Sequence, residues 1–226
     1  MNTITQNIAM FRADQFKIEY QAGNAKLSIR NREHLFYAVR KAYFDLTPRT
    51  LKKRNPTASI PSQKRDDVLQ WLADELQTYL QSGTRESFAI WHRSVCRRFL
   101  DKFNTEVLSD NYQPAYFGKA QKIVNMALKY IRCFDDVADY ESVYKECHMA
   151  IDSYILTWYN GELSVALKVP KVRTAWSNLS EQEYDTIQSN IATYLESAMN
   201  TKLSRVPFEA EFDIWWREKQ LRLRNK

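Results

Sequence analysis

The chain of 226 residues contains little glycine, little proline and few cysteines. With only 4 glycines and 6 prolines, it has too few turn-forming residues for an all-β fold, which needs a turn about every ten residues. The 3 cysteines, Cys96, Cys133 and Cys147, are odd in number and lack C-x-x-C spacing. This pattern argues against a disulfide framework and a zinc site. We therefore expect no metal, no other cofactor and a reducing compartment.

Long apolar segments are also absent. No hydrophobic run approaches the roughly 20 residues that a membrane-spanning helix needs, and residues 1–16 lack the basic and then apolar pattern of a secretory signal. Hydrophobic residues still make up 44% of the chain and charged residues 27%, a balance typical of folded proteins rather than disordered ones. We expect one globular unit over residues 1–226, cytoplasmic, monomeric and not bound to a membrane.

The charge balance is basic and the chain is rich in aromatic residues. It has 33 Lys and Arg against 27 Asp and Glu, together with 6 Trp, 13 Tyr and 11 Phe. Cations neutralise phosphates and rings stack on unpaired bases, so proteins that bind nucleic acid often show this mixture. A net charge of +6 is modest, however, and many proteins with such a charge bind no nucleic acid.

Helical periodicity dominates the sequence and predicts a mostly α fold. Helices are expected from Asn31 onward and over about 63–81, 85–103, 118–134, 152–159, 181–200 and 207–222. Ser180 and Glu183 form a capping box, and Pro207 suits a first helical position. Asn160-Gly161 is expected to end the helix that begins near Asp152.

Two segments depart from this helical pattern. Apolar and polar residues alternate on both sides of Gly23-Asn24, which predicts a short β-hairpin over 16–29. Residues 47–62 contain three prolines and the cluster Lys52-Lys53-Arg54. This stretch is interpreted as a basic loop, either a solvated linker or a loop that contacts phosphates.

The residues that carry chemistry lie within 112–160. A helix beginning near Gly118 places Lys119 and Lys122 within about one turn of its start. The positive end of the helix dipole disfavours a cation there, so we expect a lowered pKa for Lys119 and a neutral, nucleophilic amine. The alternative interpretation is two ordinary solvated lysines on a basic protein.

Asp152 is expected to cap the helix over 152–159. Its carboxylate would accept backbone N–H groups two or three residues further on. An anion fixed at a helix N-terminus can also stabilise positive charge that develops in a transition state. The sequence leaves open whether Asp152 is a catalytic group or a cap alone.

These residues resemble the helix-hairpin-helix DNA glycosylase superfamily. Gly118-Lys119-Ala-Gln-Lys-Ile-Val is similar to the hairpin glycine and following helix of that family, loosely G-x-K-T-A-x-x-V. Ala150-Ile151-Asp152-Ser153-Tyr154-Ile155 is similar to its apolar-Asp-Thr-His-Val/Ile motif. The separation of Lys119 and Asp152 is closest to that of the 8-oxoguanine glycosylase branch, which carries an insertion there.

The resemblance implies a glycosylase-like multi-helix fold with a cleft between helical lobes. Its substrate would be double-stranded DNA, with a damaged or modified base flipped into a pocket, in base repair or in anti-phage defence. Asp152 would stabilise the sugar cation, and Lys119 would be the Schiff-base nucleophile of a bifunctional enzyme that also nicks the strand. Gly118 takes the place of the hairpin glycine, while Lys122 and His148 are candidates to contact a phosphate or the base.

Several tryptophans could form a stacking surface for the extruded base, although tryptophans at helical spacing more often fill a core. The candidates are Trp91, Trp158, Trp176, Trp215 and Trp216. Trp158 is preferred because it follows Asp152 by one and a half helical turns.

Two other classes of function fit the sequence. Arg85 and His92 match the Arg-x(4–6)-His spacing of HEPN-type ribonucleases, in which both side chains act on a phosphodiester. A helical module that binds nucleic acid or protein without catalysis would instead rely on basic patches, such as Lys52-Lys53-Arg54 and 217–226. No Walker loop, HExxH, nucleophile elbow or EF-hand pattern is present, so nucleotide hydrolysis and metalloprotease chemistry have no support.

Overall fold

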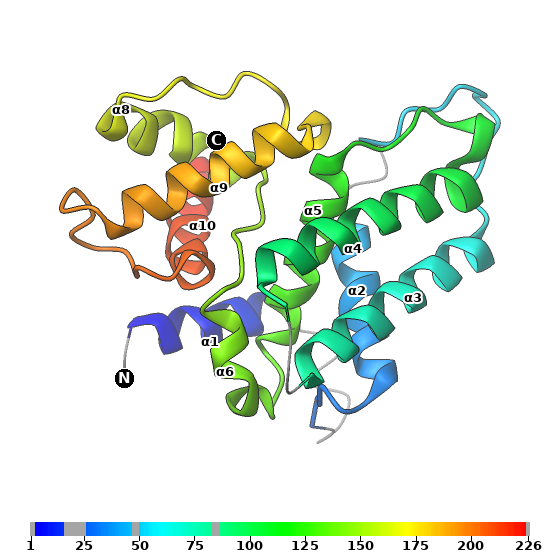
Figure 1. The fold of residues 1–226 in the computed structure, drawn as a ribbon, viewed down its shortest axis with the longest axis horizontal. Coiled ribbons are helices and arrows are strands. Elements are labelled where there is room, and N and C mark those ends of the chain that lie inside the picture. The colour runs from blue at the N-terminus through cyan, green and yellow to red at the C-terminus, as the bar shows by residue number, and fades with distance from the viewer. Residues whose placement is uncertain (1–2, 16–25, 47–49, 83–85, 225–226) are drawn as a thin grey trace.

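A computed structural model describes residues 3–15, 26–46, 50–82 and 86–224, and Figure 1 shows that helices dominate this part of the chain. The mostly α prediction is confirmed. The helices are α1 (Thr3–Gln15), α2 (Arg32–Asp45), α3 (Ser62–Gln81), α4 (Phe88–Lys102), α5 (Phe117–Ile131), α6 (Glu141–Tyr144), α7 (Ser153–Trp158), α8 (Ser164–Leu167), α9 (Glu181–Glu196) and α10 (Pro207–Arg224). None of these described helices is long and apolar enough to span a membrane.

The predicted β-hairpin over 16–29 is not confirmed. Residues 16–25 lie outside the described part of the chain, and residues 26–29 form no strand. The N–H groups of Leu27 and Ile29 are instead bound by the carboxylates of Asp135 and Asp136, at 2.9 and 3.0 Å. Because side chains from a distant turn satisfy this backbone, the described part of the segment needs no partner strand.

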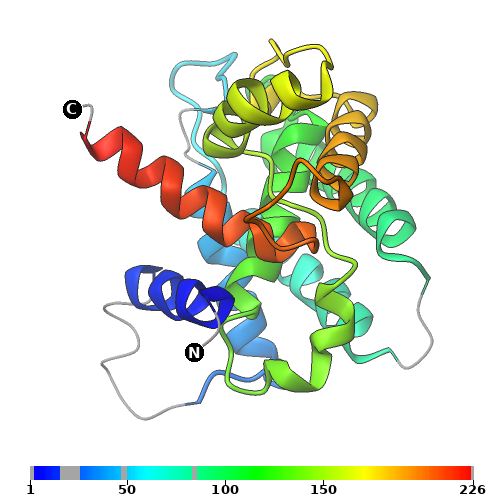
Figure 2. The same ribbon diagram turned by 90° about the vertical axis from the view of Figure 1, so that its left-hand side faces the viewer.

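The helices form two groups that meet along α5. In the first group, α2 packs on α3 and α5, and α4 packs on α3 and α5. In the second group, α10 packs on α1, α7 and α9, while α8 packs on α9. Figures 1 and 2 show α1 beside α10, so a helix from the beginning of the sequence completes the group formed by its end.

Helix α5 is the central element of the molecule. All 15 of its residues are buried, and it also contacts α9 and the short turn Trp176–Asn178 that precedes it. A helix buried on every side normally carries apolar residues only. The polar side chains of α5 therefore require partners inside the protein.

The predicted helix starts agree with the structure, whereas one predicted end is wrong. Ser180 and Glu183 form the complete capping box of α9, and α10 begins at Pro207. Asn160-Gly161 does not end the helix, because a π-helical turn over Tyr159–Leu163 continues α7 into α8. The Asn160 amide instead accepts from Val172 N at 2.8 Å and donates to Val172 O at 2.9 Å, which fixes the segment that crosses α9.

Candidate functional site

The connection that leads into α7 is buried and is held by side chains from α5. Gln121 donates from Nε2 to the carbonyl oxygen of Ile151 at 2.8 Å and accepts the N–H of Ile151 at 3.1 Å. One turn along α5, Asn125 donates to the carbonyl oxygen of Met149 at 3.3 Å. These amides hydrogen-bond to the backbone of the extended segment, as a neighbouring strand would in a sheet.

The second helix group holds the same connection from the other side. Gln188 on α9 donates to the carbonyl oxygen of Met149 at 2.7 Å. Glu211 on α10 accepts the N–H of Ala150 at 2.8 Å. Four buried side chains from three helices thus fix residues 149–151, and hence the position of Asp152 that follows them.

Asp152 caps α7, as predicted. Its Oδ1 accepts the N–H groups of Tyr154 at 2.8 Å and Ile155 at 3.0 Å. Its Oδ2 has no hydrogen-bond partner among the described residues, and it is not one of the atoms sealed from solvent. The residue is 8% exposed. One carboxylate oxygen is therefore held in place, while the other keeps an acceptor that no described residue uses.

Three lysines project from α5 along one side of the helix. Lys119, Lys122 and Lys129 are spaced three and seven residues apart, which places them within about a quarter turn of each other around the axis. All three are buried. Their partners differ, however, and the partners determine what each amine can do.

Lys119 lies in the first turn of α5, as expected, at the edge of a small recess. Its Nζ donates to the carbonyl oxygen of Ser177 at 3.0 Å and lies 5.6 Å from the centre of the Tyr116 ring. Burial lowers the pKa of Lys119, and the charge of Lys52 lowers it further. The direction agrees with the sequence-based expectation, but the largest cause is burial. Lys52, Asn178 and neighbouring residues complete the recess, whose volume is about 80 Å³.

Lys122 lies where the two helix groups meet. Its Nζ donates to the carbonyl oxygen of Asp45 at 3.4 Å and lies 4.4 Å from the centre of the Trp176 ring. Asp45 belongs to α2 in the first group, whereas Trp176 precedes α9 in the second. The amine is thus held by a carbonyl and an aromatic face, and no carboxylate pairs directly with it among the described residues.

Lys129, in contrast, has a buried carboxylate as its partner and contributes to the fold. Its Nζ forms an ion pair with Glu211 at 2.7 Å, and both side chains are buried. The rings of Phe11, Phe212 and Trp215 surround the amine at 4.8, 4.8 and 5.3 Å. Burial raises the pKa of Glu211, Lys129 opposes that rise, and the charge of Asp152 adds to it. The pair joins α5 to α10 and also fixes Ala150.

Helix geometry places Lys119 away from Asp152. Gln121 marks the side of α5 that faces the connection, because it bonds to Ile151. Lys119 projects from about 200° around the axis from Gln121, almost the opposite side, whereas Lys122 projects from about 100°. Neither Asp152 nor Lys122 lines the recess beside Lys119. Lys122 is therefore better placed than Lys119 to act together with Asp152.

Gly118 has a packing role in the structure. A Cβ added there would lie 1.9 Å from the carbonyl oxygen of Trp176, so only glycine permits this approach of the backbone to α5. Its N–H already donates to the carbonyl oxygen of Leu179 at 2.9 Å. Since this N–H is occupied, the substrate-binding role that the sequence suggested for Gly118 has no free donor to support it.

His148 is directed into the protein. Its Nδ1 lies 2.9 Å from the Tyr184 hydroxyl, and its ring packs edge-on against Phe88. Burial lowers the pKa of His148 to about 4, with a further contribution from Arg93. The side chain is therefore neutral at pH 7, and Tyr184 occupies one of its two ring nitrogens.

The ribonuclease interpretation finds no support at His92. This side chain is 1% exposed and stacks on Tyr184, and burial lowers its pKa well below the usual value. Arg85, its expected partner, lies outside the described residues. A phosphodiester could not reach a histidine enclosed in this way, because general acid–base catalysis requires direct contact with the reacting group.

The preferred stacking residue, Trp158, is part of the core. It is 1% exposed and packs edge-on against Tyr194, so a base cannot reach its face. Trp91 is also buried, against Tyr79. Of the tryptophans considered, the half-buried Trp176 is the one that contacts a lysine of the candidate site.

The sequence interpretation missed the residues that position Asp152. Gln121 and Asn125 are four residues apart in a helix whose other positions are largely apolar. Two amides on one face of such a helix could have indicated a buried polar contact. Glu211 gave a weaker signal, because an acidic residue in the first half of a helix is common.

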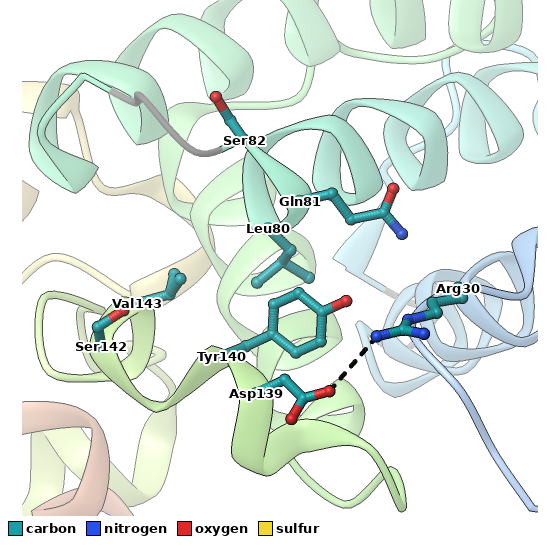
Figure 3. A pocket seen from close by; sticks show the side chains of 8 residues that line it. All are labelled: Arg30, Leu80, Gln81, Ser82, Asp139, Tyr140, Ser142 and Val143. Carbon is teal, nitrogen blue, oxygen red and sulfur yellow. Dashed lines mark ion pairs between the residues drawn. The ribbon is translucent and has the colours of Figure 1, made fainter.

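A separate hollow of about 590 Å³ lies at the end of α3 (Figure 3). It is open and lined mainly by polar groups, and Arg30 and Asp139 form an ion pair across it at 3.5 Å. Leu80 and Tyr140 form its apolar side. None of the site residues suggested by the sequence lines this hollow.

Comparison of the chain with protein-family models, with curated proteins and with solved structures finds no match.

Proposed function

We propose that this protein removes a damaged or modified base from double-stranded DNA, with Asp152 as the group that stabilises the sugar cation. The observation that carries the proposal is the hydrogen bonding of the Asp152 carboxylate, which lies where the two helix groups meet. One oxygen is fixed by the α7 N-terminus, and the other has no protein partner among the described residues. The resemblance of the flanking motifs to glycosylases supplies the reaction class.

The chemistry requires an anion beside the sugar. As the bond between C1′ and the base nitrogen breaks, its electron pair leaves with the base and positive charge builds on the sugar. A preorganised carboxylate stabilises that charge. Water then completes hydrolysis to an abasic site. If a neutral amine attacks C1′ instead, an imine forms and the strand is nicked by β-elimination.

Lys122 is the amine that we propose for such an attack. It projects from the side of α5 nearer to the Asp152 connection, and its partners are a carbonyl oxygen and the Trp176 ring. Lys119 would then contact DNA from the recess. The recess volume of about 80 Å³ is far below the roughly 300 Å³ of small ligand pockets. The recess is thus too small to hold a base, and Asp152 does not line it, so we propose that the extruded base lies outside the recess, beside Asp152.

The test of Asp152 is the Asp152→Asn variant. Asparagine caps a helix as well as aspartate does, so folding and DNA affinity should stay unchanged. Base release should fall by 100-fold or more, because the negative charge is lost. The measurement is free base and abasic sites from duplexes carrying damaged bases or phage-type modified cytosines. Release at the rate of the unmodified protein would overturn the role of Asp152.

Borohydride trapping tests the amine. A covalent adduct with DNA should form with the unmodified protein and the Lys119→Ala variant, and should be lost in Lys122→Ala. Loss in Lys119→Ala alone would restore the assignment made from the sequence. If no adduct forms while base release continues, water is the nucleophile and the protein is monofunctional.

Binding without catalysis is the second candidate function. Its support is the exposure of Lys52, Lys53 and Arg54 without any carboxylate partner in the described structure. Binding of every duplex in the panel with no product from any of them would favour this function over base excision.

A further inference from the structure

Two exposed segments carry basic side chains that no acidic residue neutralises. Residues 50–54 precede α3, and residues 168–173 cross the surface between α8 and α9. Their exposed cations are Lys52, Lys53, Arg54, Lys168, Lys171 and Arg173. None of them forms an ion pair with a described residue, and Lys53 donates only to the carbonyl oxygen of Pro56. We call these six residues the basic surface.

The arginines on α2 and α4 provide a contrast within the same molecule. Arg32 pairs with Asp74, Arg97 with Glu181 and Arg98 with Glu75, each at 2.7 or 2.8 Å. Each of these pairs uses two guanidinium nitrogens. Their charges are thus balanced locally, so the positive potential of this basic protein is strongest elsewhere.

The two parts of the basic surface lie along the same side of the molecule. Figures 1 and 2 both show the segment between α8 and α9 and the loop before α3 on the upper side, at the left and the right of Figure 1 respectively. The recess beside Lys119 joins Lys52 to Asn178. Asn178 is five residues after Arg173, so their Cα atoms are at most about 18 Å apart. Arg173 thus lies within one turn of duplex DNA, about 34 Å, of the edge of the recess that Lys52 lines.

An exposed aromatic side chain lies between them. Tyr116 is 53% exposed, precedes α5 and lines the recess with Lys52 and Lys119. Exposed aromatic residues beside free cations are typical of surfaces that hold a nucleic acid backbone and stack on its unpaired bases.

We propose that the basic surface binds the phosphates of duplex DNA and that Tyr116 stacks on a base left unpaired there. This inference names the contact surface of the proposed function and rests on that function for the choice of DNA as partner. The segment 168–173 suits the task because Val169 and Val172 pack inward while Lys168, Lys171 and Arg173 stay exposed. Asn160 holds its backbone in place.

The test is the salt dependence of DNA affinity, measured by fluorescence anisotropy with an unmodified duplex. Each phosphate contact contributes about 0.9 to the slope of log affinity against log salt. The triple variants Lys52→Gln/Lys53→Gln/Arg54→Gln and Lys168→Gln/Lys171→Gln/Arg173→Gln should each reduce the slope by about 2 to 3. The control Arg32→Gln/Arg97→Gln/Arg98→Gln removes the same charge and should change the slope by less than about 1.

The basic surface would be ruled out if the control variant lowered the salt slope as much as the loop variants do, or if neither loop variant lowered it. This conclusion would not depend on base release. Tighter binding of the full chain to duplex RNA or to anionic phospholipid vesicles than to DNA would overturn DNA as its partner. Conversely, if the salt slopes change as expected but neither the unmodified protein nor any variant releases a base, the DNA-binding surface would be supported and the proposed excision contradicted.

A second measurement tests Tyr116. Tyr116→Ala should weaken binding to a duplex with one unpaired base by about 5-fold or more, the lower end of the range for lost stacking. Binding to a fully paired duplex should change little, and Tyr116→Phe should retain both affinities. Equal losses on both duplexes would show that Tyr116 does not stack on an unpaired base.

Discussion

The two ends of α5 place the same kind of side chain in opposite chemical situations. Lys129, near the C-terminal end, pairs with Glu211 inside a cage of aromatic rings. Lys119 and Lys122, near the N-terminal end, have carbonyl oxygens and aromatic faces as partners. A lysine paired with a buried carboxylate contributes to the fold, whereas Lys119, whose pKa is lowered by burial, is a candidate reactive amine. The difference separates the structural part of the helix from its candidate site.

The largest expected effect is at Lys129. Lys129→Met leaves the Glu211 carboxylate buried without its cation, which should lower the free energy of unfolding by about 3 to 5 kcal/mol. Urea denaturation measures this loss. The double variant Lys129→Met/Glu211→Leu should recover part of it, because no unpaired charge then remains. A fully stable single variant would show that the two ends of α5 do not differ in this way.

Gln121, near the N-terminal end of α5, has the next largest expected effect. Gln121→Leu leaves the N–H and C=O of Ile151 buried without partners, at a cost of about 2 to 4 kcal/mol in unfolding free energy. Gln121→Glu keeps an acceptor for the Ile151 N–H but buries a carboxylate without a cation, so it should be no milder in urea denaturation. If base excision is the function, Gln121→Leu should also slow base release at saturating DNA, since Asp152 loses its fixed position. If Gln121→Leu lowered stability but left base release unchanged, the connection over residues 149–151 would not position the Asp152 carboxylate.

A pH effect of about 3 kcal/mol is expected from His148. Its folded pKa of about 4 lies below the unfolded value of about 6.5, so between these values the unfolded chain binds more protons. Stability is therefore complete above pH 6.5 and falls as the pH drops toward 4. In His148→Gln, the slope of unfolding free energy against pH should be shallower in that window. An unchanged slope would place the acid sensitivity elsewhere, with the buried His92 the first residue to examine.

The smallest effect is expected at Lys119. Lys119→Met removes an amine whose pKa is lowered by burial, so the unfolding free energy at pH 7 should change by less than about 1 kcal/mol. Differential scanning calorimetry of Lys119→Met and Lys129→Met side by side would compare the loss of stability at the two ends of the helix. A loss as large as that of Lys129→Met would identify Lys119 as a structural residue.

Local features of the site could be predicted from the sequence. Asp152 is a cap because its oxygen reaches N–H groups two and three residues away, and the Ser180–Glu183 box is equally local. Such contacts depend only on neighbouring residues. Lys119 was correctly placed in the first turn of α5 for the same reason.

Contacts between distant segments could not be predicted. Which side of α5 faces Asp152 depends on the bond between Gln121 and Ile151, 30 residues apart. The absence of a strand at residues 26–29 has the same cause, since Asp135 and Asp136 bind residues 27–29 from more than 100 positions away. Helix α1 was missed because Phe11 is its only buried residue over positions 5–12, so its sequence shows little periodicity.

The pairing of α1 with α10 has a consequence for how the chain folds. Phe11 contacts Phe212 and Trp215, and Asn7 donates to Asp213, so α1 cannot reach its packed position until α10 has been synthesised. The helices α2–α5 are contiguous in sequence and can associate during synthesis. The second helix group, which buries the Lys129–Glu211 pair, can form only after α10 has been synthesised. Until then Lys129 has no carboxylate partner.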